Sequence, residues 1–483
     1  MMDALVHRGP DAAGTFMACD GAGGLGHRRL RIVDPDGGDQ PLLAGDGSRA
    51  LAANGEVYNA PALRRRLEHR HRFTTRSDSE VVLHLYAEEG TNAVHHLDGM
   101  YALAIADGDE LFLARDPVGV KPLYTGQCKG DLVFASEIKA LPPGTTGVCE
   151  FPPGAAYSSV DGFSTFYTVP DPEPVDEAPS VHAGRIRRSL DDAVVKRLMS
   201  DVPLGAFLSG GLDSSAITAL IRPHVDALHT FTVGVEGSPD LEAARLMARL
   251  LGTIHHEHLL SAEEVAAHLP RIVYLLESFD QDLVRSAVPT YFTARLAAEH
   301  VKVVLTGEGA DELFAGYRYH CDVDGDEGLR RELRRSVTAM HNTNLQRVDR
   351  MTMAHSLEAR VPFLDPAMIE LALGVPVPLK RARRGQLEKW ILRTAVEDLL
   401  PTELAWRDKA QFDEGTGSVA LLASVTEEMG GETDVRAYRQ RYPQAELRSA
   451  EECLYHRLLC EAFADPEPVL ATVARWSRHR LAS

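Results

Sequence analysis

Two short segments of this 483-residue chain combine the residue types that chemistry on a phosphate group requires. The first runs from Ser209 to Ser215 and reads SGGLDSS. An apolar run, Val202–Leu208, precedes it and an apolar helical pattern, Ala216–Ile221, follows it. Its small residues are therefore expected at a helix N-terminus, where unpaired N–H groups and the helix dipole favour phosphate. The pattern predicts a pyrophosphate cradle, with a plain strand-to-helix turn as the alternative.

The side chains of this first segment suit the same ligand. Gly210 and Gly211 allow the backbone to approach a ligand closely. Asp213 can hold a magnesium ion between phosphates. Hydroxyl donors come from Ser209, Ser214 and Ser215.

The second segment reads TGEGADE from Thr306 to Glu312 and follows the apolar run Val301–Leu305. Gly307 and Gly309 flank Glu308, and Asp311 lies three residues further on. One of the two carboxylates can face a metal ion while the other takes a proton. The alternative is an acidic helix N-terminus that its dipole stabilises.

Both segments follow short apolar runs in the same half of the chain. Beyond His182, long helical periodicities alternate with the runs Val202–Leu208, Leu228–Val235 and Val301–Leu305. Such runs predict a parallel sheet with helices on both faces. Ligands bind at the carboxyl ends of strands in these sheets, so the two segments are expected to meet there.

The N-terminal part has a different texture. Up to about Tyr167, short alternating apolar segments such as Tyr101–Ala106 and Glu110–Ala114 are separated by turn residues, which indicates a strand-rich domain. Four prolines among acidic residues then indicate an extended linker. We expect one domain over 1–168, a linker over 169–182 and a second domain over 183–483.

Composition narrows the class of protein. Seventy acidic against 51 basic residues give a formal charge of -19, which disfavours nucleic acid as a partner. No apolar stretch is long enough to span a membrane, and the N-terminus lacks a signal-peptide pattern, so we expect a cytoplasmic protein. The six cysteines are scattered, as is typical of reduced thiols.

Two further patterns carry little functional weight. The glycine-rich stretch 21–26 matches G-x-G-x-x-G, but a short strand pattern follows it, so it predicts a hairpin turn rather than a dinucleotide site. The cluster His255-His256-Glu257-His258 has the wrong spacing for the H-E-x-x-H motif and no evident distant ligand.

Together, SGGLDSS at 209–215 and TGEGADE at 306–312 resemble the synthetase domain of the glutamine-hydrolysing asparagine synthetases. Further segments resemble the family in the expected order, namely FTVGV at 231–235, GSPDL at 237–241, LGTIHHE at 251–257, EARVPFLD at 358–365 and WRDKAQF at 406–412. The N-terminal part resembles the family through HRGPD at 7–11, RLRIV at 29–33, QPL at 40–42, NGEVYN at 54–59 and SDSE at 77–80.

The resemblance implies a fold for each domain. The first is expected to be an α+β, Ntn-hydrolase-like αββα sandwich, a glutamine amidotransferase domain of type 2, truncated at its first strand. The second is expected to be an α/β, Rossmann-like parallel sheet of the ATP-pyrophosphatase type. Small molecules are the implied partners, namely aspartate, ATP and glutamine or ammonia, and a homodimer is compatible with the family.

The implied reaction is a two-step ligation. ATP adenylates the side-chain carboxylate of aspartate with release of pyrophosphate, and ammonia then displaces AMP. Glu308 is expected to act as the base, and Lys409 with Arg285 to meet the departing pyrophosphate. Arg360 has a weaker claim. Asp213 and Asp311 are expected to hold Mg²⁺. The expected ATP site comprises Leu208, Ser209, Gly210, Gly211, Asp213, Ser214, Ser215, Val233, Thr306 and Gly307, with Leu208 and Val233 at the adenine.

The resemblance also implies a glutamine pocket. Arg29 would bind the glutamine carboxylate, Asn54 and Gly55 would form the oxyanion hole, and Glu56 with Asp78 would hold the α-amine. The family's nucleophile is an N-terminal cysteine that uses its own α-amine as base.

The given sequence starts at Met1, beyond the family's first strand and its N-terminal cysteine, and Cys19 is internal. Loss of a central strand would leave unpaired backbone groups that cost about 1–3 kcal/mol each, beside an otherwise intact pocket. We therefore expect translation to start upstream, and the chain as given to use free ammonia.

Two alternatives to asparagine synthesis remain open at this point. One is a related adenylating amide ligase or cyclase that acts on another carboxylic acid, although such a reaction needs no glutamine pocket. The other is a non-catalytic regulator, which would be expected to have lost the charged residues of the site.

Overall fold

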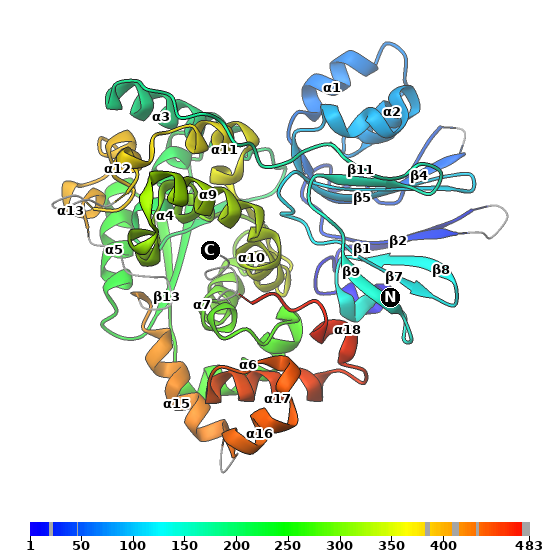
Figure 1. Cartoon of the computed structure of the whole chain (residues 1–483). Coiled ribbons are helices and arrows are strands. Elements are labelled where there is room, and N and C mark those ends of the chain that lie inside the picture. The colour runs from blue at the N-terminus through cyan, green and yellow to red at the C-terminus, as the bar shows by residue number, and fades with distance from the viewer. Residues whose placement is uncertain (19–22, 46, 382–386, 408–414, 431–433, 476–483) are drawn as a thin grey trace. The chain divides into compact units, whose positions relative to one another are not determined.

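The computed structural model describes all residues except 19–22, 46, 382–386, 408–414, 431–433 and 476–483 (Figure 1). The chain forms two compact units. Unit 1 comprises Met1–Pro170 and Val195–Pro203, and unit 2 comprises Asp171–Val194 and Leu204–Ser483. Residues 166–178 form neither helix nor strand, and α3 (Pro179–Lys196) begins inside the segment predicted as linker. Proline suits the first position of a helix, so the proline-rich composition of this segment did not distinguish a linker from a helix start.

Unit 1 contains three antiparallel sheets. The largest has the strand order β11-β10-β6-β5-β4-β3, and the others have the orders β1-β2 and β8-β7-β9. The strands are β1 (Ala12–Met17), β2 (Gly24–Arg29), β3 (Leu42–Leu43), β4 (Arg49–Val57), β5 (Gly99–Asp107), β6 (Glu110–Arg115), β7 (Tyr124–Cys128), β8 (Asp131–Ala135), β9 (Thr146–Glu150), β10 (Ala155–Ser158) and β11 (Gly162–Thr165). The pairing of β1 with β2 confirms the hairpin predicted around the glycine-rich stretch.

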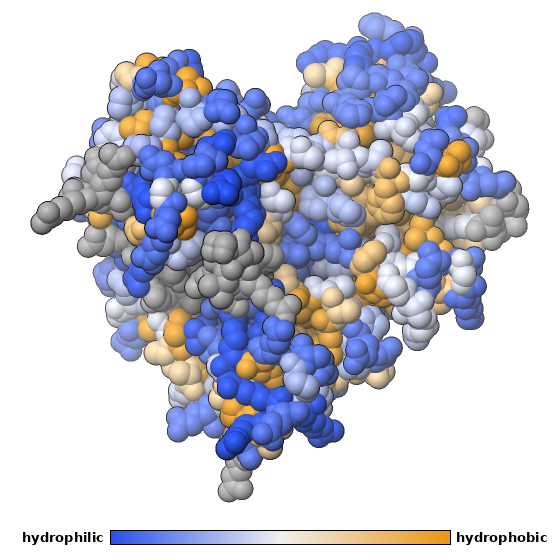
Figure 2. Space-filling view, in the orientation of Figure 1, coloured by the Kyte–Doolittle hydropathy of each residue, from blue (hydrophilic) through white to orange (hydrophobic). Residues whose placement is uncertain are grey.

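The large sheet of unit 1 is apolar on both faces. Leu103 and Ile105 of β5 pack against helices α1 (Ala60–Leu67) and α2 (Glu80–Glu89), which lie over this sheet in Figure 1. Alternate residues of the same strand, such as Ala102 and Ala104, pack against Leu25 of β2. The outward side of the two helices is hydrophilic (Figure 2). This alternation confirms the strand-rich first domain.

Unit 2 is built on a parallel sheet with the strand order β14-β13-β12-β15-β16. Its strands are β12 (Leu204–Phe207), β13 (His229–Gly234), β14 (Ile254–Leu259), β15 (Val303–Leu305) and β16 (Glu358–Arg360). The three predicted apolar runs become β12, β13 and β15, which confirms the α/β fold. The polar strands β14 and β16 had no comparable signal in the sequence.

Helices cover this sheet and extend beyond it. Ala294 and Ala297 of α7 pack with Val348 of α10 against Phe231 and Val304 of the sheet, while α4 and α5 contact β12 and β13. The helices of unit 2 after α3 are α4 (Leu212–Ile221), α5 (Pro239–Leu251), α6 (Ala262–Leu276), α7 (Gln281–Ala298), α8 (Ala310–Phe314), α9 (Gly325–Thr338), α10 (Asn344–Met353), α11 (Pro366–Leu373), α12 (Trp390–Val396), α13 (Thr402–Ala405), α15 (Ser418–Gly430), α16 (Val435–Arg441), α17 (Ala450–Ala462) and α18 (Glu467–Leu470).

Two other features of the described residues bear on the class of protein. None of their helices has both the length and the apolar character needed to cross a membrane. The five cysteines among them are free thiols, Cys128, Cys149, Cys321, Cys453 and Cys460. Cys19 lies outside the described residues.

Candidate active site

The pocket of unit 2 lies where the order of its strands reverses. From β12 the chain proceeds to β13 and β14 on one side, and then returns to place β15 on the other side of β12. Ala206 at the end of β12 is the parallel neighbour of Leu305 at the end of β15. Connections leave this point in opposite directions, which opens a crevice at the carboxyl ends of the two strands. Segments 209–215 and 306–312 follow these two strands and together line the pocket.

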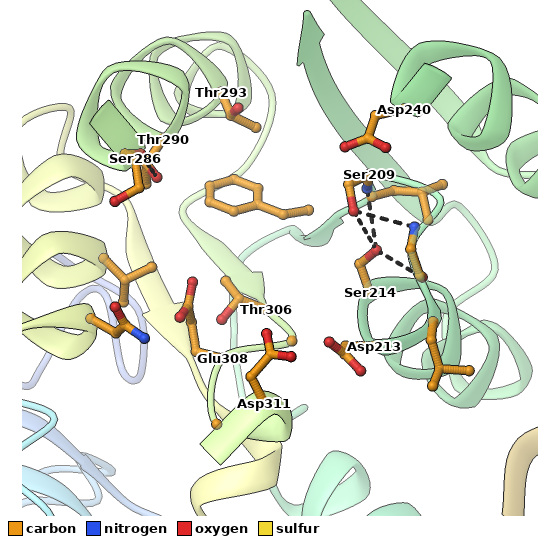
Figure 3. Close-up of a pocket in the computed structure, with 18 of the residues that line it drawn as sticks. Ser209, Asp213, Ser214, Asp240, Ser286, Thr290, Thr293, Thr306, Glu308 and Asp311 are labelled. Carbon is orange, nitrogen blue, oxygen red and sulfur yellow. Dashed lines mark hydrogen bonds between the residues drawn. The ribbon is translucent and has the colours of Figure 1, made fainter. Parts of the chain in front are cut away.

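Segment 209–215 folds as a loop that its own hydroxyl groups hold in place (Figure 3). The Ser209 and Ser214 hydroxyl oxygens are 3.0 Å apart, and the Ser209 N–H donates to Ser214 Oγ at 3.2 Å. Gly211 caps α4, and its own N–H donates to Ser209 Oγ at 3.3 Å. The loop thus presents a helix N-terminus to the pocket, as an anion site requires.

Gly210 permits this loop conformation. Its φ of +70° lies in the left-handed region, and a Cβ there would approach the backbone carbon of Ala243 to 2.4 Å. Only glycine adopts such a conformation this close to another helix without strain. The loop therefore packs directly against α5.

Segment 306–312 approaches the first loop closely. A Cβ on Gly307 would be 2.8 Å from the Cβ of Asp213, so the two segments touch at this glycine. Gly309 has a φ of +99° and caps α8, on which Asp311 lies. Gly307 thus allows close approach to Asp213, and Gly309 begins the helix that carries Asp311. The two carboxylates lie on one side of the pocket, near Glu308 (Figure 3).

Lys389 joins these two carboxylates. Its ammonium nitrogen is 2.5 Å from Asp213 Oδ2 and 2.7 Å from Asp311 Oδ1, and the residue is only 2% exposed. Gly316 packs so closely that a Cβ there would lie 2.1 Å from the Lys389 side chain. Lys389 was not among the predicted site residues, and its only signal in the sequence is its position directly before the apolar start of α12.

Glu308 faces a buried cation. Arg347 of α10 donates through Nη2 to Glu308 Oε1 at 2.5 Å and through Nη1 to Thr290 Oγ1 at 2.9 Å. Arg347 is 5% exposed, so the pair is largely shielded from solvent. The arginine fixes the direction of the Glu308 carboxylate across the pocket, a role that the sequence did not reveal.

A second glutamate lies behind the first. Glu312 is fully buried, and its Oε1 accepts hydrogen bonds from the Tyr317 hydroxyl at 2.5 Å and from Asn344 Nδ2 at 2.8 Å. Burial raises the pKa of Glu312 to about 7, and the charge of Glu308 adds to this shift. The pocket therefore holds two glutamates in different electrostatic environments.

The structure brings most of the predicted ATP-binding residues together. Those that line the pocket are Leu208, Ser209, Gly211, Asp213, Ser214, Val233, Thr306 and Gly307. Gly210 and Ser215 support the loop from behind, since neither lines the cavity. Apolar contacts come from Leu208 and Val233 together with Phe207 and Phe231, which form a surface suited to a planar ring.

Two of the residues named for other roles lie outside this pocket. Arg285 lines no part of this pocket, and its guanidinium pairs with Glu451 of α17 at 2.6 Å. Arg360 is fully buried in β16 and pairs with Glu358 at 3.0 Å, which fits a structural role. Lys409 lies outside the described residues.

Acidic side chains outnumber basic ones around the pocket. Among the described residues that line it there are seven carboxylates, Asp213, Asp240, Asp282, Glu308, Asp311, Glu312 and Glu388. The cationic side chains are four, Lys389, Arg347, Arg393 and Arg407. A polyphosphate ligand adds further negative charge, so binding it here requires additional cations.

Unit 1 gathers the residues predicted for glutamine. Asp78 Oδ2 accepts a hydrogen bond from Val57 N at 2.7 Å, directly after Glu56 in β4. Gly38 separates Arg29 from the Ser77–Asp78 turn, because a Cβ there would be 2.6 Å from Arg29 Nη2 and 3.1 Å from Ser77 Cβ.

The other residues predicted for glutamine have constrained surroundings. Gly55 has a φ of +130° with no room for a Cβ. Asn54 Nδ2 is buried without a hydrogen-bond acceptor. Arg29 donates to the carbonyl oxygens of Val33 and Asp34.

The histidine cluster at 255–258 does not converge on one point. His258 pairs with Glu264, and His255 lies beside Thr230 and Glu257. Only His256 approaches further histidines, His229 and His300, whose ligand atoms all lie within 4.8 Å of one another. His229 and His256 share a 3.0 Å hydrogen bond, and the His256 and His300 rings are stacked 3.9 Å apart. Stacked rings direct their lone pairs along parallel planes, which does not suit one shared ion.

The fold and the pocket define an α/β protein with a phosphate-type loop and an acidic loop at the switch point of a parallel sheet. The asparagine synthase family model matches residues 185–324 and 321–477, and the glutamine amidotransferase domain model matches residues 1–190.

Similar full-length proteins support the same assignment. Asparagine synthetase B [glutamine-hydrolyzing] of Escherichia coli (strain K12) is 38% identical over 484 residues, which covers 96% of this chain and 87% of that protein. Asparagine synthetase [glutamine-hydrolyzing] 2 of Oryza sativa subsp. japonica is 40% identical over 86% of this chain and 73% of that protein. This chain belongs to the glutamine-hydrolysing asparagine synthetase family.

Proposed function

We propose that this protein is an asparagine synthase that amidates aspartate at the expense of ATP. The β-carboxylate of aspartate attacks the α-phosphorus of ATP, and the bond to the β-phosphate oxygen breaks, which gives β-aspartyl-AMP and pyrophosphate. Ammonia then attacks the β-carbonyl carbon and displaces AMP. The observation that carries the proposal is the contact, at the switch point, between the SGGLDSS loop and the loop that holds Glu308.

The first step needs positive charge at the leaving group. Pyrophosphate on the 209–215 loop would receive hydrogen bonds from the N-terminus of α4. Lys389 reaches this loop through its ion pair with Asp213. We assign to Lys389 the stabilisation of the departing pyrophosphate.

The same wall fits a divalent cation. Asp213 and Asp311 both reach the Lys389 ammonium, and Asp213 Oδ1 is buried without a hydrogen-bond partner. Carboxylate oxygens together with phosphate oxygens are the ligands that Mg²⁺ prefers. Asp213 and Asp311 would hold the ion, which when bound shields the phosphate charge that the acidic pocket otherwise repels.

The second step requires a base, because the attacking nitrogen loses a proton as the amide forms. Glu308 follows β15 in the centre of the pocket, and Arg347 directs its carboxylate. We assign the proton transfer to Glu308. In unit 1, we assign glutamine binding to Arg29, Asn54, Gly55, Glu56 and Asp78, with ammonia as the nitrogen that reaches the acyl adenylate.

One assay tests the activity. Pyrophosphate release from ATP is measured with a panel of amino acids, with ammonium or glutamine as the nitrogen source. We expect release and asparagine formation with aspartate and ammonium. Release that is indifferent to aspartate would overturn the proposal.

The role of Glu308 is tested separately. In Glu308→Gln we expect adenylation, followed as pyrophosphate–ATP exchange, to persist while asparagine formation falls about 10²-fold or more. Glu370→Gln, at an exposed position on α11, is the matched control. If Glu308→Gln forms asparagine at close to the parental rate, Glu308 is not the base.

A further inference from the structure

One wall of the pocket belongs to a single helix. Five residues of α7 line the cavity at positions that share one helix face, Asp282, Leu283, Ser286, Thr290 and Thr293. The hydroxyl-bearing residues lie across the cavity from Ser209, Ser214 and Asp213 (Figure 3). We call Asp282, Ser286, Thr290 and Thr293 the α7 wall.

The hydroxyl groups of the α7 wall have already used their hydrogens. Thr290 Oγ1 donates to the Ser286 carbonyl at 2.8 Å, and Thr293 Oγ1 donates to the Pro289 carbonyl at 2.7 Å. Ser286 Oγ donates to the backbone of the preceding turn at 3.1 Å. A hydroxyl that donates to its own helix can only accept from a ligand. Arg347 already donates to Thr290 Oγ1 at 2.9 Å, so the hydroxyl lone pairs left for a ligand are mainly those of Ser286 and Thr293.

Asp282 adds charge to this acceptor surface. Its Oδ2 pairs with Arg448 at 3.1 Å, and its side chain is 32% exposed. The carboxylate stands at the N-terminal end of the row, one turn before Ser286. An acceptor row that ends in a carboxylate suits a ligand group with several N–H donors and a positive charge.

The remaining walls are matched to other parts of the substrates. The 209–215 loop and Lys389 suit the phosphates, and the apolar residues around Val233 suit the adenine ring. Glu308 lies between the phosphate side and α7 (Figure 3). The acyl group must reach from the α-phosphate past Glu308, which leaves its far end against α7.

We infer that the α7 wall binds the α-ammonium group of the acyl substrate, so that the enzyme selects an amino acid over the same acid without its amine. The inference rests on the proposed function and names the residues that set its substrate class. A carboxylate would meet the acceptor oxygens of Ser286 and Thr293 and the charge of Asp282, and an uncharged CH₂ would offer these groups no donor. Asp282, Ser286, Thr290 and Thr293 are thus specificity residues rather than catalytic ones.

The test compares aspartate with succinate, which is aspartate without the amine. For the parental enzyme we expect kcat/KM for pyrophosphate release to be at least 100-fold higher with aspartate. Ser286→Ala and Thr293→Val should each lower this preference about tenfold, chiefly through the KM for aspartate, with the value for succinate and the KM for ATP little changed. Asp282→Asn should act in the same direction.

Two controls separate recognition from a structural role. Thr352→Val removes a similar back-bonded hydroxyl, 2.8 Å from the Val348 carbonyl, at a fully buried position of α10 outside the pocket. It should leave the preference unchanged. Ser286→Ala is decisive if Thr293→Val fails to fold, since Ser286 Oγ bonds only to backbone of its own helix within the described contacts.

The outcomes distinguish this inference from the proposed function. A parental enzyme that is active with aspartate but equally active with succinate overturns the inference alone. An unchanged preference in both Ser286→Ala and Thr293→Val also overturns it. If aspartate is no substrate, the proposed function fails. The role of the α7 wall is then tested by comparing kcat/KM for the amino acid that the enzyme does use with kcat/KM for the same acid without its amine.

Discussion

At the residue scale, the chemistry of the pocket depends on how its charges are paired. Lys389 is held between Asp213 and Asp311 at 2.5 and 2.7 Å, and is almost entirely removed from solvent. A buried ammonium with two carboxylates is expensive to desolvate, so its retention beside the 209–215 loop fits a functional role better than a stabilising one.

Replacement of this lysine should therefore damage the first chemical step. We expect Lys389→Met to lower pyrophosphate release at least 10²-fold, because a leaving-group cation acts mainly in the transition state. Stopped assays of pyrophosphate release at saturating ATP and aspartate measure the effect. Lys302→Met, which removes a lysine just before the amino end of β15, should stay within about twofold of the parent. A Lys389→Met enzyme with full activity would contradict the assignment.

Glu312 gives the protein a pH-dependent stability. Its pKa is raised from 4.5 to about 7, mainly by burial. Between these two pH values the folded protein binds more protons than the unfolded chain, so the free energy of unfolding falls as pH rises through this window. Below pH 4.5 the two states are equally protonated at this group and the effect is absent.

A neutral residue at position 312 should remove this loss of stability at higher pH. Glu312→Gln keeps the oxygen that accepts from Tyr317 and Asn344. We expect it to match the parent in free energy of unfolding near pH 4.5 and to exceed it by on the order of 1–3 kcal/mol at pH 8. Denaturant unfolding at both pH values measures this difference. A variant less stable than the parent at pH 8 would show that Glu312 is stabilised as a carboxylate.

At the element scale, the 209–215 loop joins a strand, a turn and a helix without strain. The turn between β12 and α4 passes close to α5 at Gly210, which has a positive φ, whereas Gly211 has a φ of -72°. The two adjacent glycines therefore have different structural requirements.

This difference provides a matched pair of variants. Gly210→Ala should cost about 1–2 kcal/mol from its left-handed conformation alone, with a further cost from the contact with Ala243, and should raise the KM for ATP. Gly211→Ala has a permitted conformation, and its nearest contact is a movable hydroxyl at 3.3 Å. We expect only Gly210→Ala to lower the unfolding midpoint clearly. Equal midpoints would mean that the turn is not constrained by α5.

At the scale of the whole molecule, the two units carry separate binding chemistries in one chain. Unit 1 holds the residues that we assign to glutamine, and unit 2 holds the pocket that we assign to ATP. Binding of glutamine and use of ammonium should therefore be separable by substitution.

A change in unit 1 tests this separation. We expect Asp78→Asn to weaken glutamine binding about tenfold, because it removes a charged acceptor for the α-ammonium group. Ammonium-dependent pyrophosphate release should stay within about twofold of the parental value. Isothermal titration with glutamine and the pyrophosphate assay give the two readouts. Asp161→Asn, exposed in the same unit, is the control. Equal glutamine affinity in both variants would show that Asp78 does not bind glutamine.

Much of the site was predictable because its elements have strong local signals. The apolar runs that became β12, β13 and β15 are buried on both faces, so their composition reports their position directly. The glycines at 210, 307 and 309 mark backbone that must approach another segment closely. Such signals are local, so they can be recognised in the sequence before the fold is known.

Other residues gave no local signal. β14 is rich in histidine, and β16 consists of a glutamate, an alanine and an arginine, so neither has the composition of a buried strand. Arg347 and Lys389 are single charges in helical surroundings, like many surface residues, until the fold buries them. The linker prediction failed at Pro179, where proline begins a helix.

The sequence by itself determined the family of this protein, the two segments that line the pocket and the parallel strands that precede them, because each depends on neighbouring residues or on a motif. Only the tertiary structure decided which charges meet. Lys389 is 176 residues from Asp213, Arg347 is 39 from Glu308, and Arg285 turns to Glu451 instead of the pocket. Ion pairs over such separations depend on how helices pack, and no local pattern of residues specifies that packing.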